Sequence, residues 1–159
     1  MPATSAQLAE LDAQAQTILA KYDQKGAATL TLLHLAQDHL GCVTPEVEQW
    51  VSKWTEVPPV HVREVVTFYS MYHRRPVGRN HIRFCTSMSC MLNGGDRLLC
   101  HLEKKLGIRR GETTKDGRVS IEESQCLCNC EGAPMMQVNA PYVADLTEQK
   151  IDTIVDGLK

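Results

Sequence analysis

The chain has 159 residues, of which 43% are hydrophobic and 23% charged, and its formal net charge is −2. This length allows one sizeable core or two small ones, and the composition is that of an ordinary globular protein. The charge gives no reason to expect nucleic acid as a partner, and no apolar run approaches the roughly 18 residues that a membrane span needs.

Four helices are predicted in the N-terminal half, because apolar residues recur there at three- and four-residue steps. Caps and breakers divide this pattern into segments from Thr4 to Gly26, over about 27–40, from Thr44 to Pro58 and over 60–72. Four helices with short loops form a small bundle, or an arm that packs on another protein. A charged breaker at 74–80 then predicts two domains, a helical bundle over 1–78 and a second domain over 79–159.

The C-terminal half alternates strand and helix patterns. Strands are predicted at 82–84, 119–121, 136–138 and 142–144, and helices at about 90–106 and 147–158. The order β-α-β followed by β-β-α is the layout of a thioredoxin-like α/β sandwich. We therefore expect an α/β protein in which a four-helix region precedes a thioredoxin-like domain.

Six of the seven cysteines lie between positions 85 and 130, and five of them form two short loops. Cys85 and Cys90 are a C-x4-C pair, and Cys126, Cys128 and Cys130 form the second loop. The first twenty residues contain no Lys or Arg and no apolar segment of the kind found in export or transit signals, so we expect neither. An odd number of cysteines in such a chain favours metal or redox chemistry over a disulfide framework.

A binuclear iron–sulfur cluster needs four soft thiolates, two on each iron. Two loops with two sulfurs each meet this need, with Cys85 and Cys90 on one iron and Cys126 and Cys130 on the other. Cys128 lies between two of these residues and could compete with them. Structural zinc and dithiol redox chemistry are alternatives, but zinc favours C-x2-C knuckles and a thioredoxin-like dithiol enzyme needs C-x-x-C. Neither spacing occurs here.

The remaining two cysteines, Cys42 and Cys100, fall in or beside helical patterns, and we expect both to be buried small hydrophobes. The chain contains neither a G-x-G-x-x-G motif nor a Walker loop, so we expect no NADH or flavin site of its own. A cluster carrier without a substrate site must exchange electrons with another protein.

Four segments carry a resemblance to a known family: VPPVHVREVVTFYSMY (57–72), the CTSMSC loop (85–90), GETTKDG (111–117) and QCLCNCEGAPMMQVN (125–139). Together they resemble the [2Fe-2S], thioredoxin-like subunit of the NADH-oxidising module of respiratory complex I, over nearly the whole chain. The resemblance implies that the four ligands are Cys85, Cys90, Cys126 and Cys130. It also implies a subunit of NADH:quinone oxidoreductase that has no catalytic residue of its own.

The implied partners are a flavin subunit, which binds FMN and NADH, and other subunits of the peripheral arm. The cluster of such a subunit exchanges single electrons with the FMN. The resemblance further implies a cytoplasmic protein that is peripheral on the cytoplasmic side of the inner membrane as part of a complex, without membrane insertion. The helical N-terminal half is expected to pack on the flavin subunit.

Two questions stay open at the level of sequence. Homologous subunits occur in NAD-dependent formate dehydrogenases and NAD-reducing hydrogenases, and a free-standing thioredoxin-like ferredoxin or a zinc-stabilised domain is a further alternative. In addition, the family pattern has glycine where this chain has Cys128. Because glycine permits unusual backbone angles, the cysteine must either tolerate such an angle or reflect a local rearrangement.

Overall fold

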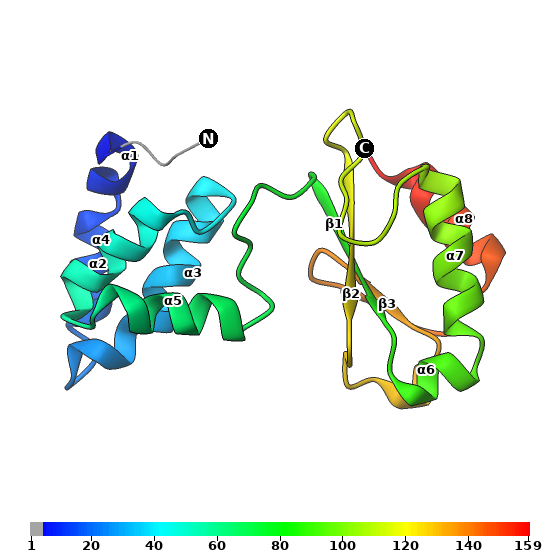
Figure 1. Cartoon of the computed structure of the whole chain (residues 1–159), viewed down its shortest axis with the longest axis horizontal. Coiled ribbons are helices and arrows are strands. Elements are labelled where there is room, and N and C mark those ends of the chain that lie inside the picture. The colour runs from blue at the N-terminus through cyan, green and yellow to red at the C-terminus, as the bar shows by residue number, and fades with distance from the viewer. Residues whose placement is uncertain (1–4) are drawn as a thin grey trace. The chain divides into compact units, whose positions relative to one another are not determined.

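The computed structural model describes residues 5–159, so the helix cap predicted at Thr4 lies outside the described part of the chain. The chain divides into two compact units, one ending at Pro76 and the other spanning Val77–Lys159. The four strands all belong to the second unit (Figure 1).

The described part of the first unit is helical. Its elements are α1 (Ser5–Glu10), α2 (Asp12–Leu19), the 3-10 helix η1 (Lys25–Ala28), α3 (Thr29–Leu40), α4 (Pro45–Thr55) and α5 (Pro59–Phe68). The single helix predicted before Gly26 is wrong, because the chain breaks at Leu11 and leaves the helix again after Leu19. Leu11 lies between the two helices, although its backbone stays in the right-handed helical region (φ −87°, ψ −10°), and its side chain is only 3% exposed.

Hydrogen bonds between side chains connect the helices of this unit around an apolar core. The Asp12 carboxylate accepts hydrogen bonds from Trp50 Nε1 at 2.8 Å and from Trp54 Nε1 at 3.1 Å, which ties α2 to α4. The buried carboxylate of Glu48 accepts from Arg63 Nε at 2.7 Å, which ties α4 to α5. The core consists of apolar side chains from every α-helix of the unit, among them Leu8, Ala15, Leu32, Leu33, Val47, Val51, Val62 and Val66.

The second unit is a four-stranded sheet with helices. Its elements are β1 (Asn80–Cys85), α6 (Met88–Leu92), α7 (Gly95–Leu106), β2 (Val119–Ser124), η2 (Cys130–Gly132), β3 (Met136–Val138), β4 (Tyr142–Val143) and α8 (Glu148–Gly157). The strand order is β2-β1-β3-β4, in which β1 runs parallel to β2 and antiparallel to β3, and β3 runs antiparallel to β4. The predicted order of strands and helices is therefore confirmed. No helix within residues 5–159 is long and apolar enough to cross a membrane.

One predicted helix of this unit is divided. The helix expected over about 90–106 is instead α6 followed by α7, because Gly94 adopts the left-handed conformation (φ +85°) between them. The next residue, Gly95, lies so close to the first cysteine loop that a Cβ there would be 2.7 Å from the Cys90 carbonyl oxygen. The break thus turns the chain away from the sheet edge and keeps the cysteine loop against the start of α7.

The sheet has one apolar and one polar face. Ile82 and Phe84 of β1 are fully buried in a core shared with α7 and α8, which lie on the same side of the sheet (Figure 1). The alternate residues carry polar side chains, and His81 Nε2 lies 2.9 Å from Glu122 Oε2 of β2. This alternation is what a strand with one covered face requires, and it delivers Cys85 to the carboxyl end of β1.

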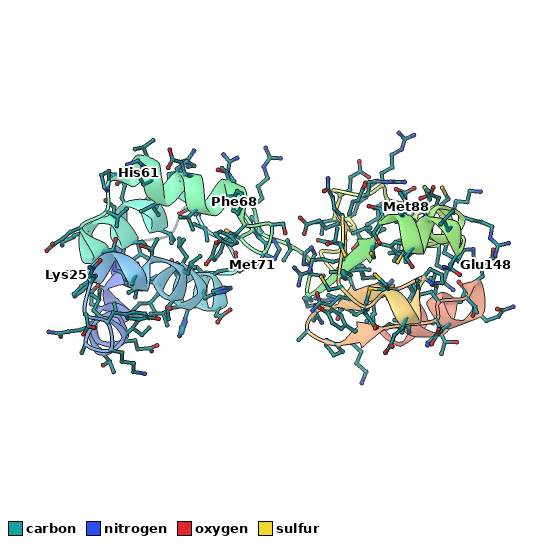
Figure 2. The ribbon with its side chains drawn as sticks, turned by 90° about the horizontal axis from the view of Figure 1, so that it is seen from below. Lys25, His61, Phe68, Met71, Met88 and Glu148 are labelled. Atoms are coloured by element: carbon teal, nitrogen blue, oxygen red, sulfur yellow. The ribbon has the colours of Figure 1, made fainter. Side chains whose placement is uncertain are left out.

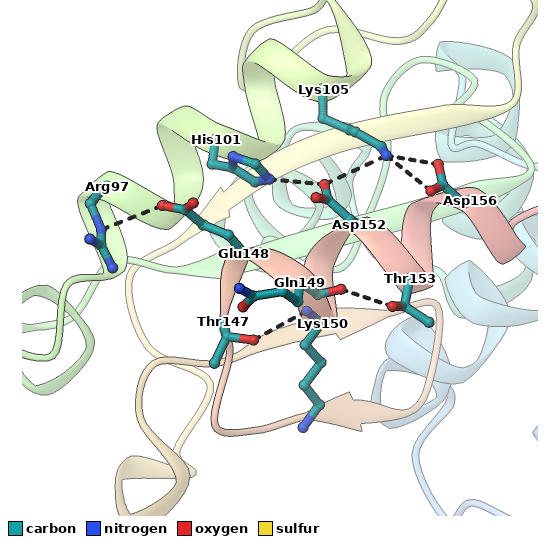
Figure 3. Close-up of polar contacts among 10 residues, drawn as sticks. All are labelled: Arg97, His101, Lys105, Thr147, Glu148, Gln149, Lys150, Asp152, Thr153 and Asp156. Atoms are coloured by element: carbon teal, nitrogen blue, oxygen red, sulfur yellow. Dashed lines mark hydrogen bonds and ion pairs between the residues drawn. The ribbon is translucent and has the colours of Figure 1, made fainter.

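Ion pairs join α7 to α8 along their outer sides (Figure 3). His101 Nε2 lies 2.9 Å from Asp152 Oδ1, and Lys105 Nζ lies 3.6 Å from the same oxygen and 2.9 Å from Asp156 Oδ1. Thr147 caps α8 by accepting a hydrogen bond from the Lys150 backbone N–H at 3.2 Å. These contacts fix the direction of α8 across the sheet.

The substitution Asp152→Asn is expected to remove part of the acid sensitivity of this unit. The hydrogen bond from His101, followed by the positive charge of Lys105, holds the pKa of Asp152 below its ordinary value. A carboxyl whose pKa is lower in the folded chain stabilises the fold at pH values above the ordinary Asp pKa of about 4. This stabilisation is lost as the pH falls through the pKa of the folded state. In urea unfolding followed by far-UV circular dichroism, the advantage of the wild type over the variant should therefore shrink between pH 7 and pH 3. An equal difference in unfolding free energy at pH 7 and at pH 3 would contradict this prediction.

Candidate iron–sulfur centre

The first cysteine loop connects β1 to α6. Cys85, the last residue of β1, is 2% exposed, and Cys90 within α6 is 1% exposed. Ser87 precedes α6 at the cap position, but its side chain makes no cap hydrogen bond. Its hydroxyl oxygen instead accepts a hydrogen bond from the Cys85 thiol at 3.4 Å, and once that thiol loses its proton the same hydroxyl donates to the thiolate.

The surroundings of the two buried thiols favour one negative sulfur. Burial raises the pKa of the Cys85 thiol, but hydrogen bonds from the Ser87 hydroxyl and from the backbone N–H groups of Ser87 and Leu127 outweigh it and hold that pKa below its ordinary value. Burial and the hydrogen bond with the Cys85 sulfur raise the pKa of Cys90. Cys85 therefore gives up its proton first, and thiolates are the form of cysteine that ligates metals.

The second cysteine loop follows β2. Cys126, Cys128 and Cys130 are exposed, whereas Leu127 is buried. The backbone N–H of Cys128 donates to Cys126 Sγ at 3.3 Å, and the two sulfur atoms are 3.9 Å apart. Cys130 begins the short 3-10 helix η2.

The two loops are held against each other. Leu127 and Met135 form a small apolar cluster with Cys85 and Cys90. The backbone N–H of Cys85 donates to the Met135 carbonyl at 3.2 Å. Ser89 Oγ of α6 donates to the carbonyl oxygen of Cys130 at 3.4 Å. The polypeptide on both sides of the centre is therefore fixed by apolar contacts and by hydrogen bonds.

Cys128 adopts the left-handed conformation, with φ +59°. The cysteine therefore tolerates the angle that glycine would take, at a cost of about 1–2 kcal/mol for a residue with a Cβ atom. Its pKa is raised by the hydrogen bond with Cys126 and by the negative charge of that sulfur, with smaller contributions from the charges of Cys130 and Cys85. Thiols of both loops therefore contribute to the raised pKa of Cys128.

This donor set fits a binuclear iron–sulfur cluster. The four predicted ligands lie in two adjoining loops. Cys85 packs with Cys90 in one buried cluster, Cys126 contacts Cys128, and Cys130 is tied to the first loop through its backbone. Soft thiolates surrounded by N–H and O–H donors are the ligands that such clusters use. All seven cysteines are free thiols, so none of the four predicted ligands is in a disulfide.

The structure also shows what the sequence-based prediction missed. The Ser87 hydroxyl lies beside the Cys85 sulfur, the backbone N–H of Leu127 helps to lower the pKa of Cys85, and the backbone N–H of Met135 opposes the rise in the pKa of Cys90. A serine before a helix ordinarily indicates a cap, so its position carried no signal of a sulfur contact.

The prediction that Cys100 is buried is wrong, because it lies on the face of α7 opposite Leu98, Leu99 and Leu102 and is exposed. Cys42 is buried, as predicted.

Comparisons with known proteins agree with this geometry. A family model described as "Thioredoxin-like [2Fe-2S] ferredoxin" matches residues 15–159. The chain is 41% identical over 149 residues to the E subunit of the NADH-quinone oxidoreductase of Rickettsia bellii, a match that covers 91% of this chain and 89% of that protein. It is 39% identical over 140 residues to the second E subunit of the NADH-quinone oxidoreductase of Rhizobium meliloti, with 88% of this chain and 83% of that protein covered.

A solved structure supports the fold. A chain of an NAD+-reducing [NiFe]-hydrogenase in the H2-reduced state superposes with a TM-score of 0.71 at 23% identity, over 81% of this chain and 22% of the hydrogenase chain. At this level of identity the likeness concerns the fold alone. It extends over both the helical and the sheet-containing parts, since neither unit by itself makes up 81% of the chain.

Proposed function

The chain belongs to the thioredoxin-like [2Fe-2S] ferredoxin family, and we propose that it serves as the electron-transfer subunit of an NADH:quinone oxidoreductase. The observation that carries this proposal is the pair of adjoining cysteine loops, in a chain that is about 40% identical to the E subunits of such enzymes over most of its length. The relatives are subunits of an oxidoreductase complex, so this chain acts within a complex.

We assign the four ligands to Cys85 and Cys90 on one iron and to Cys126 and Cys130 on the other. When bound, the cluster accepts and releases one electron at a time. The chain's own residues position the ligands and set the charge around them. The Ser87 hydroxyl lies 3.4 Å from the Cys85 sulfur, where it would donate to the thiolate that a bound cluster requires, while Leu127 and Met135 pack against the buried pair.

A flavin subunit that binds FMN and NADH is the electron-exchange partner in this proposal, with other subunits of the peripheral arm as neighbours. Two surfaces support a protein partner. Beside Cys90, the helix α6 exposes Met88 by 73% and Leu92 by 74%, and the Met88 side chain is labelled in Figure 2. In the helical unit, Phe68 at the end of α5 is 80% exposed. Exposed apolar side chains of this size are characteristic of contact surfaces.

The location follows from the proposed complex. We place the chain on the cytoplasmic side of the inner membrane, as a peripheral subunit attached through its partners. The likeness to the NAD+-reducing hydrogenase concerns the fold alone, so it does not favour the alternative host enzymes over the one proposed.

Anaerobic co-expression with the flavin subunit tests this function. The two chains are expected to co-purify, and NADH should reduce the centre, giving the rhombic one-electron signal of a reduced binuclear cluster in electron paramagnetic resonance. The same chain without the flavin subunit should give that signal with dithionite but not with NADH. A pair of co-purified chains whose cluster is not reduced by NADH would refute the proposed electron exchange.

The substitution Ser87→Ala is expected to lower the reduction potential of the centre. Reduction adds negative charge, so a hydroxyl that donates to the Cys85 sulfur stabilises the reduced state more than the oxidised state. A hydrogen bond contributes about 0.5–1.5 kcal/mol, which corresponds to a shift of up to about 60 mV for one electron. Redox titration monitored by electron paramagnetic resonance measures it. Ser87→Thr, which keeps the hydroxyl, and Ser89→Ala, whose hydroxyl contacts a carbonyl rather than a sulfur, should both stay close to the wild type. Equal shifts in Ser87→Ala and Ser89→Ala would contradict this role.

A further inference from the structure

We propose that Cys126 and Cys128 form a disulfide when the chain holds no cluster, and that this disulfide prevents the centre from being loaded. The inference rests on the proposed function only in taking Cys126 as a ligand. It assigns a role to Cys128, the one cysteine of the two loops that the ligand set leaves unused.

The geometry of the second loop carries the first step of the argument. The two sulfur atoms are 3.9 Å apart, and the Cys128 N–H donates to Cys126 Sγ, so the side chain of Cys126 already lies back against the backbone of Cys128. A disulfide requires a sulfur–sulfur distance of about 2.05 Å and Cα atoms within about 7 Å. Residues two positions apart are held near this Cα limit by the chain itself, and side-chain rotation brings the sulfurs together.

Accessibility distinguishes this pair from the two buried thiols of the first loop, although Cys100 and Cys130 are exposed as well. Cys126 and Cys128 are exposed, whereas Cys85 and Cys90 are 2% and 1% exposed and lie under Leu127. Thiol–disulfide exchange needs a thiolate that the oxidant can reach. The exposed pair therefore reacts before the buried pair.

The backbone at Cys128 supplies an independent observation. A left-handed residue with a Cβ atom costs about 1–2 kcal/mol relative to glycine, which carries no such penalty. Backbone strain of this kind clusters at functional sites. The left-handed turn is also what brings the N–H and the sulfur of Cys128 toward Cys126.

The chemistry needs an external oxidant, and a low-molecular-weight disulfide is sufficient. The Cys126 thiolate attacks one sulfur of the small disulfide, forms a mixed disulfide and releases one small thiol. The Cys128 thiolate then attacks the Cys126 sulfur, forms the Cys126–Cys128 bond and releases the second small thiol. The chain loses two electrons and two protons, and the small disulfide is reduced to two thiols.

Oxidised glutathione added to the cluster-free full-length chain tests the proposal. The measurements are made in a Cys100→Ala background, because Cys100 is exposed and would itself take up glutathione. This chain should lose two of its six free thiols and the mass of two hydrogens, without retaining glutathione. Cys130→Ala should behave in the same way, because its Cys126–Cys128 pair is intact. Cys128→Gly combined with Cys130→Ala should stop at the first step and carry one glutathione on Cys126.

Loading completes the test. The oxidised wild type should take up no cluster from iron and sulfide until dithiothreitol restores the two thiols. Glutathione retained by the Cys100→Ala chain, a disulfide that disappears when Cys130→Ala is added, or an oxidised chain that loads as fast as the reduced one would each overturn the proposal. Thiol counts and masses of the cluster-free chain do not depend on electron transfer, so failure of the proposed function would be seen separately, as a reduced chain that binds no iron.

Discussion

The substitution Cys85→Ala is expected to abolish the iron–sulfur cluster, so that iron in the anaerobically purified chain falls from about two atoms to nearly none. The thiol of Cys85 is the more acidic of the buried pair, and its site is only 2% exposed. One sulfur would then remain for an iron that needs two. Iron and sulfide analysis, together with the visible absorption of the chain, measures the result.

Two other cysteines provide the controls. Cys100→Ala removes an exposed thiol from α7 and should retain the full iron content, and Cys42→Ala should do so as well. Cys126→Ala, in the exposed loop, should lose the cluster without disturbing the buried pair, which separates loss of a ligand from loss of the fold. Far-UV circular dichroism checks that each variant is folded. A Cys85→Ala chain that keeps two irons would show that the ligand assignment is wrong.

The substitution Phe84→Ala is expected to destabilise the second unit by about 3–5 kcal/mol, since it removes a large, fully buried side chain from a closely packed core. Phe84 precedes Cys85 and pairs with Met136 across β1 and β3, so the resulting cavity lies in the core beneath the strand that carries the first cysteine ligand. Hydrogen exchange followed by mass spectrometry measures the change for peptides from β1 and α7. Loss of the cluster should be faster in the variant as well.

Phe68→Ala is the matched control, because it deletes the same side chain at a position that is 80% exposed (Figure 2). Surface substitutions of this kind change stability by about 0.5 kcal/mol or less. Hydrogen exchange in the second unit should be unchanged. Equal protection of the sheet in wild type and Phe84→Ala would show that Phe84 does not support the core.

The periodic parts of the fold were predictable from the sequence, and the local breaks were not. The strand containing Ile82 and Phe84 alternates apolar and polar residues. The helix that starts at Pro45 has proline at its first position and acidic residues in its first turn. Both elements therefore follow from local sequence. The break at Leu11 lies within an uninterrupted apolar stripe. The spacing of apolar residues therefore gives no sign of it.

The cysteine loops, too, were predictable in part: their presence followed from the sequence, but their local contacts did not. Spacing alone predicted two loops with two thiols each, and the structure places those loops in contact. The sulfur contact of Ser87 was not predictable, because a serine before a helix has the same sequence pattern whether it caps the helix or not. The left-handed angle of Cys128 was raised as a question only by comparison with a glycine, since a cysteine by itself gives no sign of such an angle.

Both tryptophans of the chain, Trp50 and Trp54, lie in α4 and donate to the same carboxylate oxygen of Asp12. Indole fluorescence is therefore a property of the helical unit alone. The visible colour of a bound cluster belongs to the other unit, which has no tryptophan. Each half of the chain thus has its own optical reporter, and a single denaturation experiment read at two wavelengths follows the two halves independently, without an added label.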